Sequence, residues 1–296
     1  MGLLPHFFRG NMKKRNYAKI NLTLDILGVL ENGYHDLKMV MQLIDLYDEV
    51  DVSWEEGGNA LAIEITSNRD DIPLDERNIA WKAAELVAGD SCGKVKIYIE
   101  KNIPVAAGLA GGSGNAAVVI ECLNELMGLG MTGEEMMEMG GKIGKDVPFI
   151  ISGYPCAIAT GDGTELEPVE PADCFILLSK PDISVSTGEA YRKYDEIMPD
   201  YHPDTEGMLD AIKEKNTAEM GKKTGNVLEF VTAGEYNCIN NTKDIMLSCE
   251  GNLGASMSGS GPSVFGIFRS KEDTEKASEK LLEINRETFV ARTITE

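Results

Sequence analysis

The clearest pattern in the chain is a strict alternation of apolar and polar residues between residues 18 and 26. One set of alternate positions is apolar and the other is polar: Ala18, Ile20, Leu22, Leu24 and Ile26 against Lys19, Asn21, Thr23 and Asp25. A period of two is typical of a β-strand with one buried face. We therefore predict a half-buried strand that presents Lys19 beside Asn21 on its polar face.

Helical and strand patterns follow one another through the middle of the chain. Asn78 precedes apolar residues at helical spacing, which predicts an N-cap, and residues 94–101 alternate again and predict a second strand. Apolar positions at 116, 120, 123 and 127 predict a helix that ends at Gly128 or Gly130. Thr132 and Glu135 have the spacing of a capping box, which predicts a further helix start.

Strands and helices also interleave in the last third of the chain. We expect strands over residues 174–178 and 263–268, and helices over residues 187–196, 208–213 and 271–284. This mixture predicts the α+β fold class. Because 296 residues exceed the usual size of one domain, we expect two lobes around a cleft, with domains at residues 1–158 and 159–296.

A glycine-rich segment lies between the strand predicted over residues 94–101 and the following helix. Glycines let backbone N–H groups converge on one point, and a helix N-terminus adds partial positive charge. We interpret the segment as a phosphate cradle; the alternative is a flexible turn. It matches neither the Walker motif nor the dinucleotide fingerprint. The expected cradle residues are Pro104, Ala106, Ala107, Gly108, Leu109, Ala110, Gly111, Gly112, Ser113, Gly114 and Asn115.

Two further segments carry candidate chemistry. Asp146, followed by Pro148, predicts a helix start with an acid at its first position, for which the alternative is a simple N-cap. The stretch from Gly254 to Phe265 is a turn of small residues that runs into an apolar strand. The alternative for this stretch is a loose linker, although linkers are not usually joined directly to a core strand.

Composition narrows the classes of partner. The formal charge of −21 argues against nucleic acid or an anionic membrane surface, because both need an extended basic face. A small anionic ligand could still be captured locally by backbone N–H groups, lysines and a metal ion. No run approaches the ~20 apolar residues of a membrane span, residues 1–15 do not resemble a secretory signal, and six scattered cysteines lack zinc-site spacing. We expect a cytoplasmic protein.

The three segments in this order, with Lys19 and Asn21 ahead of them, resemble the superfamily of galactokinase, homoserine kinase, mevalonate kinase and phosphomevalonate kinase, the GHMP kinases. From about Tyr17 to near the C-terminus the chain resembles one family within it, the 4-diphosphocytidyl-2-C-methyl-D-erythritol kinases of the non-mevalonate (methylerythritol phosphate) isoprenoid pathway. The stretches that carry this resemblance are Ala18-Lys-Ile-Asn-Leu-Thr-Leu, Gly33-Tyr-His-Asp-Leu and Gly144-Lys-Asp-Val-Pro-Phe.

The resemblance implies a two-lobed fold and one reaction. The N-terminal lobe would be of the ribosomal-protein-S5 domain-2 type and the C-terminal lobe ferredoxin-like, with the active site between them. The γ-phosphoryl group of ATP, bound with Mg²⁺, would pass to the 2-hydroxyl of the cytidine-diphosphate-linked methylerythritol. Asp146 would accept the hydroxyl proton. Lys19 would favour the ionised carboxylate and stabilise the transferring phosphoryl group.

The resemblance also implies the residues that bind this small-molecule substrate. Asn21 would hydrogen-bond the sugar alcohol, and its alternative is a surface polar residue. Tyr34 would stack on cytosine and the His35 segment would read the polar edge of the base, where the alternative is an ordinary loop histidine. Thr187 would face the substrate and Tyr191 would be a second aromatic against the base; the alternative is packing on an amphipathic helix.

Two residues depart from the family pattern Gly-Leu-Gly-Gly-Gly-Ser-Ser: this chain has Ala110 and Gly114. Backbone N–H donors survive both changes, but a side-chain contact to phosphate or Mg²⁺ at position 114 is lost, which leaves Ser113 as the remaining hydroxyl. We expect weakened nucleotide binding, which a comparison of the ATP KM with that of Gly114→Ser would test.

Two other functions compete with this one. A sibling kinase for mevalonate, homoserine or a sugar would share the ATP loop, but the segment Tyr34-His35 argues against it. A non-catalytic binding protein on the same scaffold would usually lose its acid or its lysine, and here Asp146 and Lys19 are both present. Both a monomer and a homodimer fit the sequence.

Overall fold

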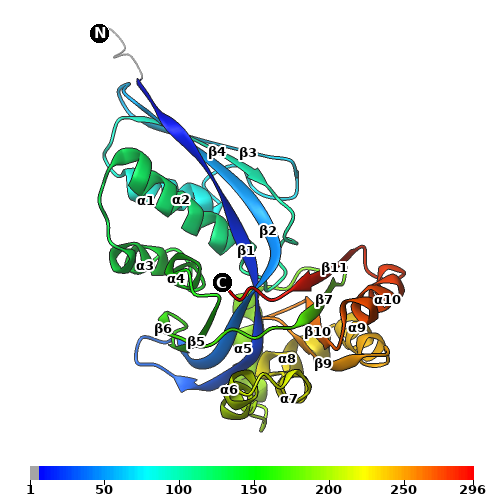
Figure 1. The fold of residues 1–296 in the computed structure, drawn as a ribbon. Coiled ribbons are helices and arrows are strands. Elements are labelled where there is room, and N and C mark those ends of the chain that lie inside the picture. The colour runs from blue at the N-terminus through cyan, green and yellow to red at the C-terminus, as the bar shows by residue number, and fades with distance from the viewer. Residues whose placement is uncertain (1–6) are drawn as a thin grey trace. The chain divides into compact units, whose positions relative to one another are not determined.

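The structure, a computed structural model, describes residues 7–296 (Figure 1). The chain forms two compact units, and each is assembled from separate stretches. The first unit contains the residues up to Tyr17, Tyr47–Val105 and Ala110–Gly153, and the second contains Ala18–Leu46, Ala106–Leu109 and Tyr154–Glu296. The units therefore interleave along the chain, whereas the predicted domains are continuous. The domain limits at residues 158 and 159 stay a prediction.

The first unit is a sheet covered by helices. Strand β3 (Leu61–Ser67) is parallel to β4 (Gly93–Glu100), and β4 is antiparallel to the second half of β2 (His35–Glu56), with Val50 opposite Ile99. The beginning of β1 (Phe7–Val29) follows β2 in the strand order. Helices α1 (Ile79–Ala88) and α2 (Gly111–Met127) pack against each other, followed by α3 (Gly133–Gly141) and α4 (Val147–Ser152), as Figure 1 shows.

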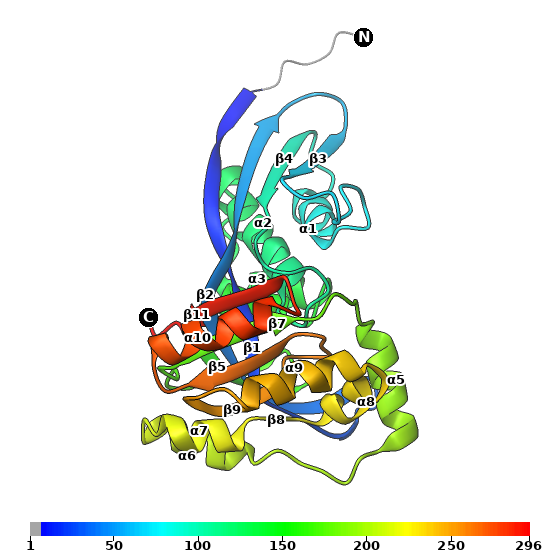
Figure 2. The same ribbon diagram turned by 90° about the vertical axis from the view of Figure 1, so that its right-hand side faces the viewer.

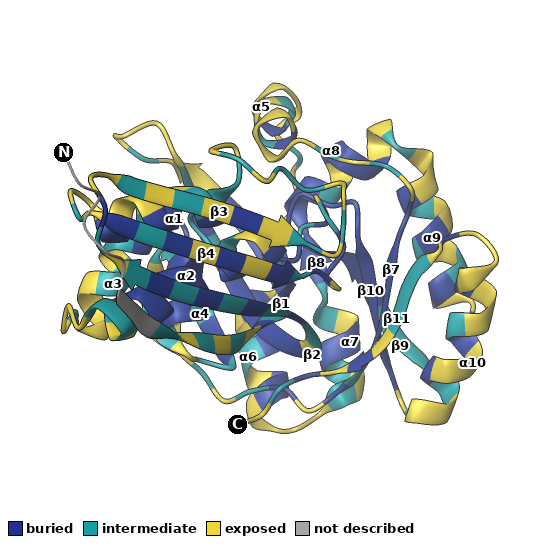
Figure 3. Ribbon diagram, turned by 90° about the horizontal axis from the view of Figure 1, so that it is seen from above, coloured by how far each residue is buried: buried dark blue, intermediate teal, exposed yellow. Residues whose placement is uncertain are grey.

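The core of the first unit lies between this sheet and its helices. Along β4, buried and more exposed residues alternate, a pattern that Figure 3 shows as changes of colour along the strand. The buried residues of the strand meet small and branched residues of α1 and α2, so that each element buries the apolar face that its sequence pattern predicts. These residues include Val95, Ile97, Ile99, Ala80, Ala83, Ala84, Ala116 and Ile120.

The second unit contains the other halves of the long strands and a separate antiparallel sheet. The first half of β2 pairs with β5 (Cys156–Gly161), β5 pairs with β6 (Glu165–Pro168), and the end of β1 pairs with β8 (Gly225–Asn226). The second sheet has the order β11-β7-β10-β9, and these strands are Glu287–Arg292, Phe175–Lys180, Val264–Phe268 and Asn252–Met257.

Helices complete the second unit. Figure 2 shows α9 (Asn237–Leu247) and α10 (Lys271–Leu282) along the four-stranded sheet, which they contact. The other helices are α5 (Thr187–Ile197), α6 (Thr205–Lys213), α7 (Thr217–Lys223) and α8 (Val227–Glu235). The mixture of antiparallel sheet and segregated helices confirms the predicted α+β class.

Several local predictions are confirmed. Asn78 caps α1 by accepting a hydrogen bond from the Ala80 N–H group at 3.0 Å, and Thr132 with Glu135 forms a capping box at the start of α3. The prediction that the strand at residues 18–26 is half-buried is wrong, because both of its faces are buried. The polar face is covered by residues more than 150 positions later in the chain, through the contacts Asn21–Gly259, Thr23–Thr205 and Asp25–His202.

Two findings concern the helices as membrane spans and the state of the cysteines. Within residues 7–296, every helix is too short or too polar to cross a membrane. All six cysteines are free thiols, and four of them are buried.

Candidate functional site

The glycine segment does join a strand to a helix, between β4 and α2. Its helix begins after Ala110, which has left-handed backbone angles (φ 57°, ψ 20°) and makes no side-chain capping bond. The N–H group of Gly114 donates to the Ala110 carbonyl at 2.8 Å, which opens the helical ladder. The N–H groups of residues 111–113 precede that ladder and have no acceptor inside the helix. They are therefore suited to bind an anion.

A buried ion pair lies beneath the start of α2. The Lys101 ammonium is 2.5 Å from Asp48 Oδ2, and the two side chains are 4% and 0% exposed. The other oxygen of Asp48 accepts hydrogen bonds from the N–H groups of Asn102 and Ile103, both at 2.8 Å. Burial lowers the pKa of Lys101 from its ordinary 10.5, and the Asp48 carboxylate opposes that shift. A Cβ at Gly111 would lie 2.7 Å from Lys101 Nζ, so glycine makes room for the ammonium.

The sequence analysis missed this pair. Lys101 stands at the end of a predicted strand, but its partner lies 53 residues earlier and no spacing rule connects them. The one signal available was a lysine shortly before the glycine-rich segment.

Asn16 occupies the space beside Gly114. Its side chain is fully buried, and its Nδ2 donates to the Gly111 carbonyl at 2.8 Å. A Cβ on residue 114 would overlap the Asn16 carboxamide. Where the family pattern has a serine side chain at position 114, this chain has a glycine, and the Asn16 side chain from β1 occupies the space.

Asp146 stands at the N-cap position of α4, as the sequence predicts, with Pro148 in the first turn. Its side chain makes no capping hydrogen bond with that helix. The simpler alternative, that Asp146 serves only to cap α4, therefore lacks the bond that would support it. The catalytic role of Asp146 stays a prediction.

Residues 106–109 of the glycine segment belong to the second unit, where they pack against the turn between β9 and β10. Ser258 Oγ donates to the Gly108 carbonyl at 3.0 Å, and the Lys19 N–H group donates to the Leu109 carbonyl at 3.1 Å. Gly108 has φ +73°, and a Cβ there would overlap the Ser258 carbonyl. The glycine segment and the stretch from Gly254 to Phe265 thus contact each other within this unit. The linker alternative for residues 254–265 is wrong, because β9 and β10 form an antiparallel pair and Ser258 is buried.

Lys19 and Asn21 lie beside this turn. The Lys19 ammonium donates to Asn21 Oδ1 at 2.8 Å, and the Gly259 N–H group donates to the same oxygen at 3.0 Å. The two residues are 3% and 0% exposed, so the alternative of a surface polar role for Asn21 is wrong. Asn21 orients the lysine and ties it to the turn. Its predicted contact with the sugar alcohol stays a prediction.

The predicted substrate residues of the second unit form two groups. Thr187, the first residue of α5, has its hydroxyl 2.9 Å from Ser260 Oγ and so lies at the same turn. The rings of His35 and Tyr191 contact each other, with centroids 4.8 Å apart, whereas Tyr34 is half exposed in the turn before β2. Sequence reasoning missed Asp195, which lies 2.7 Å from His35 Nε2.

The proposed catalytic pair is divided between the two units. Lys19 belongs to the second unit and Asp146 to the first. The glycine segment is divided as well, with residues 106–109 in the second unit and its other residues in the first. The proximity of Lys19 and Asp146 therefore stays a prediction.

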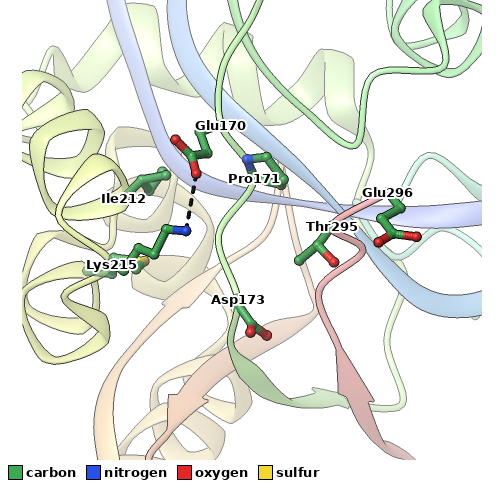
Figure 4. Close-up of a pocket in the computed structure, with 8 residues that line it drawn as sticks. Glu170, Pro171, Asp173, Ile212, Lys215, Thr295 and Glu296 are labelled. Atoms are coloured by element: carbon green, nitrogen blue, oxygen red, sulfur yellow. Dashed lines mark ion pairs between the residues drawn. The ribbon is translucent and has the colours of Figure 1, made fainter.

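A separate cavity of about 360 Å³ in the second unit is lined by none of the predicted site residues (Figure 4). Its lining includes Glu170, Asp173 and Lys215, with Thr295 and Glu296 on another side. Glu170 pairs with Lys215 at 3.4 Å and Asp173 with Arg292 at 2.8 Å. The side chains of Glu170, Lys215 and Asp173 thus already have ion-pair partners within the protein. We therefore add no residue of this cavity to the candidate site.

Comparison with known proteins places the chain in a family. The family described as "GHMP kinases N terminal domain" matches residues 78–154, and "GHMP kinases C terminal" matches residues 208–286. The chain is 42% identical over 286 residues to the 4-diphosphocytidyl-2-C-methyl-D-erythritol kinase of Clostridium tetani, covering 96% of this chain and 100% of that one. The protein of the same name from Caldicellulosiruptor bescii is also 42% identical, over 95% of this chain and 98% of that one.

A solved structure agrees with these relatives. The fold resembles the crystal structure of a 4-(cytidine 5'-diphospho)-2C-methyl-D-erythritol kinase, with a TM-score of 0.77 and 27% identity over 95% of this chain and 99% of that one. The glycine segment, the acid at the start of α4 and the lysine on β1 all fall within these full-length matches. The chain therefore belongs to the 4-diphosphocytidyl-2-C-methyl-D-erythritol kinase family, within the GHMP kinases.

Proposed function

We propose that the protein transfers the γ-phosphoryl group of ATP to the 2-hydroxyl of 4-(cytidine 5'-diphospho)-2-C-methyl-D-erythritol, a step in isoprenoid precursor synthesis. The observation that carries the proposal is its similarity, over nearly the whole length of both chains, to kinases of that name. Free, mostly buried thiols support the cytoplasm as the compartment, since reduced cysteines are typical of it.

The chain's own residues fit MgATP. The N–H groups of residues 111–113 have no acceptor within α2, and a Cβ at Gly112 would find no atom closer than 3.7 Å, so the helix start can receive phosphate oxygens. Among residues 7–296, no cluster of three or more histidine, cysteine or acidic side chains could hold a metal ion. Mg²⁺ would come bound to the phosphates of ATP, with Ser113 as the hydroxyl of the cradle that could contact it. The bound MgATP supplies the phosphoryl group and neutralises its charge.

The remaining chemistry is positioning and proton transfer. Asp146 accepts the proton of the 2-hydroxyl as its oxygen attacks phosphorus, and Lys19 stabilises the negative charge of the transferring group. Asn21 supports this role because it fixes the Lys19 ammonium at 2.8 Å. Tyr34 and His35 bind the cytosine, and Thr187, Tyr191 and Asn21 complete the substrate site. The cradle formed by residues 104–115 holds the phosphates.

The test is direct identification of the product. The protein is incubated with MgATP and the cytidylylated methylerythritol, and the product and the position of its phosphate are determined by mass spectrometry and phosphorus NMR. Mevalonate, homoserine and galactose serve as matched acceptors. We expect a 2-phosphate from the first acceptor and none from the others. Phosphorylation of another acceptor would favour a sibling kinase, and the absence of any transfer would favour a non-catalytic binding protein.

A further inference from the structure

The His35 ring is held at one edge by a carboxylate. His35 is the first residue of β2, its side chain is 15% exposed, and its Nε2 lies 2.7 Å from Asp195 Oδ1. Asp195 lies on α5, 160 residues later in the chain. An ionised carboxylate can only accept hydrogen bonds, so the contact requires a proton on Nε2. In a neutral imidazole, Nδ1 is then an acceptor.

Two aromatic rings of the same helix contact the His35 ring. The Tyr191 ring lies 4.8 Å from that of His35 at an interplanar angle of 32°, and the Tyr194 ring lies 6.1 Å away at 85°. Tyr194 is itself buried, with its hydroxyl 3.5 Å from the Ile26 carbonyl. Three side chains of α5 therefore fix both the position and the direction of the imidazole.

We propose that Asp195 is a positioning residue that determines base specificity. In the neutral imidazole it keeps the proton on Nε2, so that Nδ1 can accept a hydrogen bond from the exocyclic amino group of cytosine. Uracil carries a carbonyl oxygen at that position and would place acceptor against acceptor. The inference rests on the proposed function, because that function supplies the cytidine ligand. Asp195 acts through His35 and not on the ligand.

The tautomer can be measured without any substrate. The chain has three histidines, so ¹⁵N-labelled histidine gives a simple spectrum in which a His202→Gln variant assists assignment. We expect His35 in the wild type at about pH 8 to carry its proton on Nε2 alone. Asp195→Asn, whose amide oxygen can accept the same bond, should retain this tautomer, and Asp195→Ala should give a mixture. A proton on Nδ1 in the wild type, or an unchanged spectrum in Asp195→Ala, would overturn the proposal.

Kinetics test the consequence. The ratio of kcat/KM for the cytidine-linked and uridine-linked substrates should fall roughly tenfold or more in Asp195→Ala, through a raised KM for the cytidine substrate with the ATP KM unchanged. Asp195→Asn should retain most of the wild-type preference for the cytidine-linked substrate. Glu196→Ala, which removes the neighbouring exposed carboxylate of α5, is the matched control and should keep all of it.

The two possible failures are distinguishable. If the wild type phosphorylates the cytidine substrate and Asp195→Ala keeps the wild-type ratio, only the role of Asp195 is overturned. If the wild type does not phosphorylate the cytidine substrate, the proposed function falls and the base-specific role falls with it.

Discussion

Asn16 and Gly114 share one space: a side chain at position 114 would overlap the Asn16 carboxamide, which is fully buried. Asn16 also donates to the Gly111 carbonyl, in the first turn of the helix that carries the proposed phosphate cradle. The two residues must therefore change together. This relationship alters the expectation that Gly114→Ser alone would improve nucleotide binding, because the added side chain would displace Asn16 first.

We predict that Gly114→Ser lowers the free energy of unfolding by about 1–3 kcal/mol, the usual cost of overpacking a close-packed site. Urea denaturation of the wild type, both single variants and the double variant Asn16→Ala,Gly114→Ser measures this. The double variant should be more stable than the sum of the single changes allows, because the two residues are in contact. The effect of a serine at position 114 on the ATP KM is then read in the double variant against Asn16→Ala. Strictly additive losses would refute the coupling.

A second prediction concerns the buried pair beneath the cradle. Asp48→Asn leaves the Lys101 ammonium buried without its counter-charge, and we expect a loss of about 3–5 kcal/mol in the free energy of unfolding. The matched control is Glu55→Gln in the same sheet, which breaks a more exposed pair with Lys96, 2.6 Å apart. The control should cost about 1 kcal/mol or less. Equal losses of unfolding free energy in the two variants would show that burial of the pair Lys101–Asp48 does not increase the cost of breaking it.

Local patterns in the sequence predicted about half of the helices and strands that the structure describes between residues 7 and 296. The cap at Asn78, the capping box at Thr132, the alternation of β4 and the place of the glycine segment between a strand and a helix each depend on neighbours within a few residues, and each is confirmed. The sequence analysis did not predict helices α7 to α9 or strands β2, β3, β5, β6, β8, β9 and β11. Two of these strands do carry a period-two pattern, at Val50, Val52 and Trp54 in β2 and at Leu61, Ile63 and Ile65 in β3.

Contacts between distant residues could not be predicted from one sequence. The polar face of β1 looked solvated, because the residues that cover it come from the last third of the chain. The partners of Lys101 and His35 are 53 and 160 residues away. The family resemblance supplied the candidate site residues, but the contacts that orient them became visible only in the folded chain.

A third prediction concerns thiol reactivity. Burial raises the pKa of Cys122, Cys156 and Cys174 to about 12, whereas Cys92 and Cys238 are exposed. At about pH 8 a disulfide reagent should modify the two exposed thiols quickly. Cys122, Cys156 and Cys174 should react slowly because only thiolates react and these three stay protonated, and Cys249 should react slowly because it is buried. The variant Cys92→Ser,Cys238→Ser should lose the fast phase. A fast phase that survives in this variant would contradict the burial of the other thiols.

The same thiols make stability depend on pH, and this is a fourth prediction. The folded chain holds their protons up to about pH 12, while the unfolded chain releases them near the ordinary pKa of 9.0. The free energy of unfolding should therefore fall as pH rises above 9.0. Urea denaturation on both sides of that pH measures the slope. Replacing Cys156 by alanine should make the slope shallower, and an unchanged slope would count against this cause.

The last prediction addresses the proposed base. Asp146→Asn should lower kcat by roughly 10²–10⁴-fold, because an amide cannot accept the hydroxyl proton. Because asparagine has nearly the size and shape of aspartate, the variant should keep its fold and its affinity for ATP, which nucleotide titration and urea denaturation check. Asp90→Asn, an exposed position after α1, is the matched control and should retain full turnover. If Asp146→Asn turned over at the wild-type rate, the proton would have to leave by another route and the assignment of Asp146 would fail.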